Sequence, residues 1–131
     1  MFGLKVIVMT ILLVDDDQDD QDIFREALSL AKPGCQLMVA QEGEEGLKVL
    51  QDGSFRPDYI FLDVNMPKMN GREFLIAVKS NPAYSKIPVV MYSTSNQKSE
   101  LGEYFTLGAS NFITKPSEFE VLVTYLKTVL H

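Results

Sequence analysis

Short apolar runs alternate with amphipathic stretches along this chain, and the alternation predicts five strands and five helices. The apolar runs are nearly continuous, which is typical of strands covered on both faces. Between them, apolar residues recur at the three- and four-residue spacing of helices. The predicted strands are 10–14, 36–40, 59–62, 88–92 and 111–114. The first predicted helix begins within the acidic run 15–22 and ends at 31, and the other four cover 43–50, 72–80, 98–107 and 117–130.

Turn-forming residues separate these elements and support their order. Pro33-Gly34, Asp52-Gly53 and Asn81-Pro82 each follow a predicted helix. Ser117, followed three residues later by Glu120, predicts a capping box at the start of the last helix. Strands joined by helical crossovers run parallel, and the crossovers are right-handed. The pattern therefore predicts an α/β protein with a three-layer, doubly wound parallel sheet.

Composition narrows the possible functions. The 131 residues predict one domain, and the net charge of −6 disfavours direct binding to nucleic acid. A single cysteine, Cys35, excludes an internal disulfide; it is expected to be a small core residue in a reducing, cytoplasmic setting. The only histidine is the last residue, His131, so zinc sites and Ser-His or Cys-His catalysis lack their ligands and bases. No apolar run reaches the roughly twenty residues of a membrane span.

Polar residues follow several of the predicted strands directly. Asp15 and Asp16 follow the first strand, Asp63 the third, Ser93 or Thr94 the fourth, and Lys115 the fifth. The carboxyl ends of parallel strands share one edge of the sheet, where ligands of open α/β sheets bind. Carboxylates there favour Mg²⁺, which prefers oxygen ligands, and one carboxylate can accept a phosphoryl group as an aspartyl phosphate. A lysine and a hydroxyl offset charge on the phosphoryl oxygens.

These residues carry a resemblance to a known family. The acidic pair, the lone Asp63, the stretch Met66-Pro67-x-Met69-Asn70-Gly71, the hydroxyl after the fourth strand and Lys115-Pro116 occur in that order. The chain thus resembles a two-component response regulator receiver domain of the CheY-like kind from Met9 to Leu130. The resemblance implies a flavodoxin-like sheet of strand order 2-1-3-4-5. Residues 9–131 are then the receiver domain, and residues 1–8 are an N-terminal extension or a lengthened first strand.

The resemblance also implies a role for each acidic residue. Asp63 is expected to be the phosphoacceptor. Asp16 is expected to bind Mg²⁺ directly with Asp15 assisting, and Asn65 is expected to lend its backbone carbonyl to the metal. The remaining acids of the run, Asp19, Asp20 and Asp22, are expected to be a solvated helix start.

The other roles concern the fourth and fifth strands. Ser93 is expected to hydrogen-bond the phosphoryl group, with Thr94 left open as the alternative hydroxyl. Lys115 is expected to pair with the phosphoryl oxygens, and its bond to Pro116 is expected to be cis. Phe112 occupies the aromatic switch position. The sequence departs from the common pattern at three positions: Phe112 replaces Tyr, Ser93 replaces Thr, and Asn70 replaces Asp.

Two other readings of the acids fit less well. Asp15, Asp17, Asp19 and Glu26 match positions of an EF-hand loop, but Asp20 stands where the sharp turn needs glycine. Asp63-Val64-Asn65 resembles the nucleophile motif of haloacid-dehalogenase phosphatases. In those enzymes a second Asp acts as acid and base, and Asn65 cannot titrate.

The expected function is that of a phosphoacceptor rather than an enzyme. A histidine kinase or a histidine phosphotransfer protein would supply the phosphoryl group, and the signal would leave through an unknown protein partner, because the sequence ends at His131. Gly71-Arg72-Glu73 and the stretch 81–88 resemble single-domain receivers that serve phytochrome-type or hybrid kinases. The last two helices and the fifth strand would form any weak homodimer. The rival hypothesis is a receiver-like interaction module that works without phosphate.

Overall fold

The computed structural model describes residues 8–64, 66, 69–93 and 98–130, with the backbone alone for 98–100. The strands are β1 (Thr10–Val14), β2 (Gln36–Ala40), β3 (Tyr59–Leu62), β4 (Val89–Ser93) and β5 (Asn111–Thr114). The helices are α1 (Gln18–Ala31), α2 (Gly43–Asp52), α3 (Gly71–Ser80), α4 (Lys98–Thr106) and α5 (Phe119–Val129). Strands and helices alternate strictly, as the hydrophobic pattern predicts.

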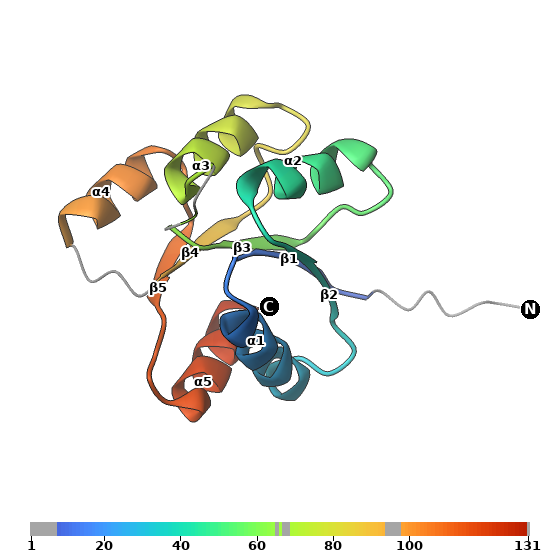
Figure 1. Cartoon of the computed structure of the whole chain (residues 1–131), viewed down its shortest axis with the longest axis vertical. Helices are drawn as coiled ribbons and strands as arrows, with labels where there is room; N and C mark the ends of the chain where they lie inside the picture. Colours follow the sequence, from blue (N-terminus) through green and yellow to red (C-terminus); the bar gives the residue numbers. More distant parts are fainter. Residues whose placement is uncertain (1–7, 65, 67–68, 94–97, 131) are drawn as a thin grey trace, which may run out of the picture.

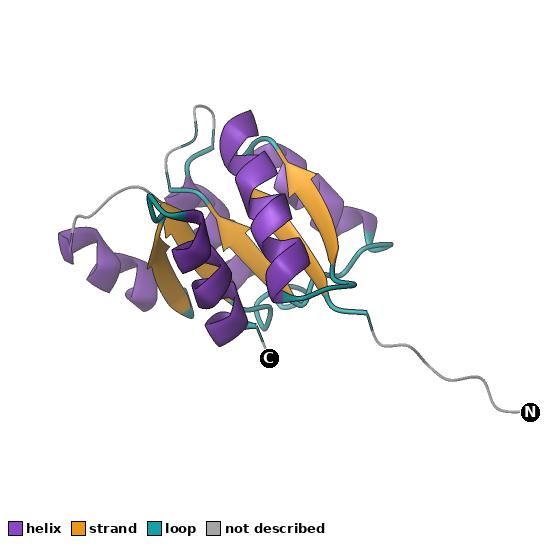
Figure 2. Ribbon diagram, turned by 90° about the horizontal axis from the view of Figure 1, so that it is seen from below, coloured by secondary structure: helices purple, strands orange, loops and turns teal. Residues whose placement is uncertain are grey.

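The five strands form one parallel sheet in the order β2-β1-β3-β4-β5. Helices α2, α3 and α4 cover one face, and α1 and α5 cover the other (Figure 1). The strand arrows run in the same direction, so that their carboxyl ends meet along one edge (Figure 2). The predicted three-layer architecture and strand order are confirmed.

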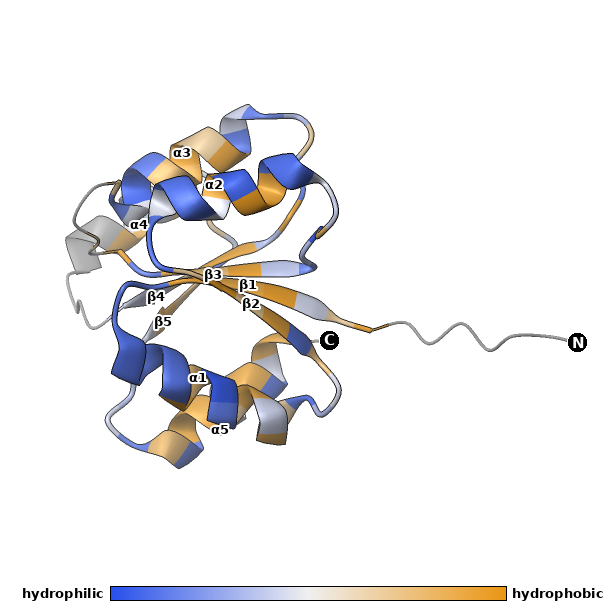
Figure 3. Cartoon of the chain, turned by 45° about the vertical axis from the view of Figure 1, so that its right-hand side comes forward, coloured by the Kyte–Doolittle hydropathy of each residue, from blue (hydrophilic) through white to orange (hydrophobic). Residues whose placement is uncertain are grey.

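The core is divided between the two faces of the sheet because side chains alternate along each strand. Leu12 and Val14 of β1 pack beneath α2 and α3, whereas Ile11 and Leu13 pack toward α1 and α5. Most of the sheet is apolar in colour, whereas the first turns of α1 stand out as hydrophilic (Figure 3). Cys35, expected to be a small core residue, is only partly buried and packs against the margin of the second of these clusters.

The start of the last helix differs from the prediction. Helix α5 begins at Phe119, and its N-cap, Glu118, makes no side-chain capping hydrogen bond. The predicted Ser117–Glu120 capping box is therefore wrong. Glu118 has an extended backbone, so the helix starts one residue after it and Ser117 lies outside the capping position. A capping box does form at α3, where Asn70 accepts from the backbone of Glu73 and Glu73 accepts from the backbone of Asn70.

Candidate functional site

The sheet places three of the predicted site residues through its own hydrogen bonds. The backbone N–H of Asp15 donates to Ala40 O on β2 at 3.0 Å, and that of Asp63 donates to Val14 O on β1 at 2.9 Å. The backbone N–H of Lys115 donates to Ser93 O on β4 at 2.7 Å. Each residue follows a strand and continues its ladder by one bond. The positions of these side chains therefore depend on the sheet rather than on flexible loops.

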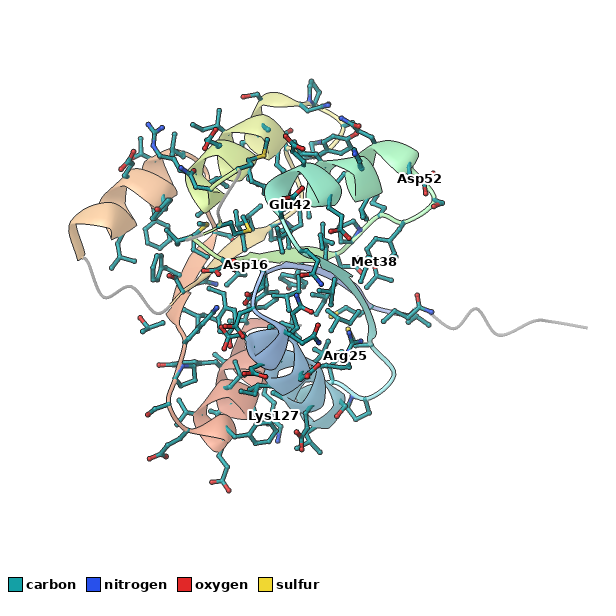
Figure 4. All side chains as sticks on the ribbon, in the orientation of Figure 1. Asp16, Arg25, Met38, Glu42, Asp52 and Lys127 are labelled. Carbon is teal, nitrogen blue, oxygen red and sulfur yellow. The ribbon has the colours of Figure 1, made fainter. Side chains whose placement is uncertain are left out.

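Three carboxylates converge at this edge. Oxygens of Asp15, Asp16 and Asp63 all lie within 4.8 Å of one another. Asp15 is fully buried and Asp63 nearly so, whereas Asp16 is exposed; its side chain lies near the carboxyl end of β1 (Figure 4). An all-oxygen donor set that is partly buried and open on one side fits a hard divalent cation that keeps some of its water. The fourth predicted ligand, Asn65, lies outside the described residues.

The ammonium of Lys115 lies among the acids. Its Nζ is 2.9 Å from Asp15 Oδ2, 2.8 Å from Asp20 Oδ2 and 3.6 Å from Asp63 Oδ2. It also lies 5.0 Å from the ring centroid of Tyr92, a cation–π contact. Burial works to lower the pKa of Lys115, but its hydrogen bonds to Asp20 and Asp15 outweigh this and raise it. The lysine therefore carries its positive charge at neutral pH.

Asp15 is held on every side by defined partners. Its Oδ1 accepts from the backbone N–H of Asp17 at 2.9 Å, its Oδ2 accepts from Lys115, and its backbone oxygen accepts from Gln21 Nε2 at 2.7 Å. Burial raises the pKa of Asp15, while Asp17 and Lys115 act in the opposite direction. Asp15 is therefore both a candidate metal ligand and the anchor that fixes Lys115.

The two predicted switch residues come from neighbouring strands. Ser93 is fully buried at the end of β4. Phe112 on β5 is half-buried, and its ring packs on Tyr104 of α4 with centroids 6.1 Å apart. The alternative hydroxyl, Thr94, lies outside the described residues. Phe112 therefore joins β5 to α4 through one aromatic pair.

The bond between Lys115 and Pro116 is trans, since no peptide bond within the described ranges is cis. The predicted cis-proline is therefore wrong for this structure. The trans form of an X–Pro bond is favoured by roughly 0.5–1 kcal/mol, so a cis bond needs an added constraint. The trans chain already satisfies the backbone of Lys115 through Ser93 and its side chain through Asp15 and Asp20.

Two residues of the site were missed in the sequence. Asp20 was expected to be solvated, yet it binds Lys115, and Gln21 is buried against Asp15. The signal for Asp20 was present: it lies four residues before Phe24 and seven before Ala27, on the inward face of α1. Its acidity suggested a helix-dipole role instead, which needs no tertiary contact.

Comparisons with known proteins agree with this geometry. Residues 11–127 match the family described as "Response regulator receiver domain". The chain belongs to this family. It is therefore a receiver domain of two-component signalling, a class of module that works with histidine kinases or phosphotransfer proteins. The sequence-based recognition is confirmed.

Individual relatives and solved structures include response regulators of similar length. The receiver domain is 34% identical over 110 residues to the response regulator Rcp1 of Synechocystis sp., covering 80% of this chain and 75% of Rcp1. Its fold matches the phosphorylated cyanobacterial phytochrome response regulator RcpA with a TM-score of 0.86 and 31% identity, over 94% and 91% of the two chains. The Mn²⁺-bound form of Rcp1 matches with a TM-score of 0.82 and 30% identity, over 92% and 91%. Some curated relatives are longer, and the chain spans between 14% and 50% of those, whereas it covers 86% of Protein PilG of Pseudomonas aeruginosa.

None of the helices in the described residues combines the length and apolar character needed to cross a membrane.

Proposed function

We propose that this receiver domain accepts a phosphoryl group on Asp63 and signals through a protein partner. The observation that carries the proposal is the convergence of Asp15, Asp16, Asp63 and Lys115 at one edge of the sheet. One carboxylate at the centre of this group can attack phosphorus, while the lysine offsets the charge of the phosphoryl oxygens. Ser93, buried at the adjacent strand end, is the candidate hydroxyl that hydrogen-bonds the group.

The transfer itself needs no further protein group as acid or base. A carboxylate oxygen of Asp63 forms a bond to phosphorus as the bond from phosphorus to the donor nitrogen of a phosphohistidine breaks. The electron pair of the broken bond stays on the imidazole, which then takes a proton from solvent. Such reactions depend on positioning and charge stabilisation, which the fixed backbone of Asp63 and the ammonium of Lys115 provide.

A divalent cation, Mg²⁺ in the cell, fits the acidic cluster. Asp16 and Asp63 would hold it directly with Asp15 assisting, and the carbonyl of Asn65 would complete the protein ligands. When bound, the cation neutralises part of the charge shared by the carboxylates and an incoming phosphoryl group. The solved Mn²⁺-bound form of Rcp1 supports this role for the cluster.

The phosphorylated state would act on the face made by α4, β5 and α5. A phosphoryl group brings an additional charge of about −1.5 to −2 into an acidic site. Ser93 and Lys115 would move toward it, and Phe112 would repack against Tyr104. The donor is a histidine kinase or phosphotransfer protein, and the match to a phytochrome response regulator favours a phytochrome-type sensor kinase. Any homodimer would use this same face.

Incubation with acetyl phosphate and Mg²⁺ tests the proposal. Intact-protein mass spectrometry should show one phosphoryl adduct on the wild-type protein and none on Asp63→Asn. The matched control is Asp58→Asn, which changes an acid at the opposite, amino-terminal end of β3 and should keep the adduct. If the wild-type protein gains no mass with acetyl phosphate or with a phosphorylated phosphotransfer protein, it is instead an interaction module that works without phosphate.

A further inference from the structure

The ammonium of Lys115 is bound by an acid that lies outside the metal cluster. Asp20 Oδ2 is 2.8 Å from Nζ, the shortest of the three carboxylate distances to this lysine. The lysine side chain is only 8% exposed, and that of Asp20 is 32% exposed. We propose that Asp20 is a positioning residue that keeps Lys115 within reach of a phosphoryl group but away from the attacking carboxylate. This inference rests on the proposed function and deepens it.

The contacts of Lys115 Nζ leave one of its N–H groups for a phosphoryl group on Asp63. An ammonium has three N–H donors, and two of them bind Asp15 and Asp20. The ring of Tyr92 covers a further side at 5.0 Å. Asp63 Oδ2 lies at 3.6 Å, beyond a direct hydrogen bond. A phosphoryl group would add oxygens to Asp63 and could accept the third N–H without displacing either acid.

Asp20 is held in place by the start of α1. Its backbone N–H donates to the side chain of the N-cap, Asp17, at 3.0 Å. One turn later Phe24 is fully buried and contacts the rings of Phe61 and Tyr92, at centroid distances of 5.0 and 5.6 Å. The same helix face therefore supports both the acid that binds Lys115 and the ring beneath it.

Loss of Asp20 would change the balance at the site. The ammonium would be left with Asp15 and Asp63 as its carboxylate partners. It would move onto Asp63 and form a close ion pair with the nucleophile, which lowers the reactivity of that carboxylate. The substitution Asp20→Asn should therefore slow phosphorylation, although it removes a negative charge near the path of an anionic phosphodonor.

The direction of the change in phosphorylation rate distinguishes a positioning role of Asp20 from a general effect of its charge. With acetyl phosphate at saturating Mg²⁺, Asp20→Asn should be phosphorylated about tenfold more slowly than the wild type, as expected when a charge-assisted hydrogen bond is lost. Asp19→Asn removes the same charge from the neighbouring, exposed residue of the same turn. It should react at the wild-type rate or slightly faster. A charge effect alone would make both variants faster.

A second measurement reads the lysine without any phosphoryl transfer. Proton–nitrogen NMR of lysine ammonium groups should give a protected Lys115 signal in the wild type and in Asp19→Asn. In Asp20→Asn, the signal should shift and its protons should exchange faster with water. A wild type that takes no phosphoryl group overturns the proposed function and this inference with it. Two results overturn this inference alone. One is a wild type that is phosphorylated no faster than Asp20→Asn, and the other is a Lys115 signal that does not change in Asp20→Asn.

Discussion

Three carboxylates of the site, those of Asp15, Asp20 and Asp63, share one buried ammonium, that of Lys115. The substitution Lys115→Met keeps most of the apolar stem and leaves the fully buried Asp15 without its ammonium. Removing one partner of a buried ion pair costs about 3–5 kcal/mol. We expect the free energy of unfolding to fall by about 3 kcal/mol at pH 7, measured by urea denaturation.

The stability that Lys115→Met loses relative to the wild type should become smaller as the pH falls. Burial raises the pKa of Asp15 above 3.8, so the folded protein takes up this proton at a higher pH than the unfolded chain does. Loss of Lys115 raises that pKa further. As the pH falls through the pKa that Asp15 has in the folded protein and toward 3.8, the folded state gains stability relative to the unfolded state. The gain is larger in Lys115→Met, so its free energy of unfolding should approach that of the wild type. A difference that widens on acidification would contradict this.

Among the elements, α3 is fixed against the backbone that carries Asp63. A Cβ on Gly71, its first residue, would lie 2.5 Å from the backbone oxygen of Asp63 and 2.9 Å from Cα of Val64. Neither backbone atom can move without moving the site. The substitution Gly71→Ala should therefore lower stability by about 1–3 kcal/mol and also slow phosphorylation of Asp63. Thermal unfolding and the mass-shift assay measure the two effects.

Helix α4 supplies the matched control for this substitution. Among the described residues, a Cβ on Gly102 would meet no atom within 4 Å beyond its chain neighbours and the backbone of its own helix. Because alanine favours helices over glycine, Gly102→Ala should raise stability by up to about 1 kcal/mol and leave the phosphorylation rate unchanged. Equal effects of the two substitutions would mean that close packing at Gly71 is not what positions Asp63.

The molecule as a whole carries a net charge of −6 and gathers three acids at one edge. A cation that binds only the folded state stabilises it, by about 2.7 kcal/mol at a concentration one hundred times Kd. We expect MgCl₂ to raise Tm relative to KCl of equal ionic strength. Asp16→Asn, at an exposed ligand position, should abolish this rise, whereas Asp19→Asn should retain it. A rise that persists in Asp16→Asn would place the cation elsewhere.

Most of the fold and the central residues of the site were predictable because local signals agreed with the tertiary result. Buried parallel strands are continuous apolar runs, and the residue after such a run must reach the edge of the sheet. Asp15, Asp63 and Lys115 follow this rule directly. The errors concern places where local signals compete. A serine and a glutamate three residues apart predict a cap, but the backbone at Glu118 decided where α5 begins.

The sequence by itself determined which side chains stand at the strand ends, since hydrophobic periodicity and strand direction depend only on the order of residues. Tertiary structure decided what each acid does there. Asp15 and Asp16 are adjacent, yet one is buried against Lys115 and the other is exposed. Asp20 binds a lysine 95 residues away. Burial and long-range ion pairs depend on how α1 packs beside α5 and brings its first turn to Lys115, which follows β5. Helical spacing indicates which face of α1 points inward, but it does not specify the partner that this face meets.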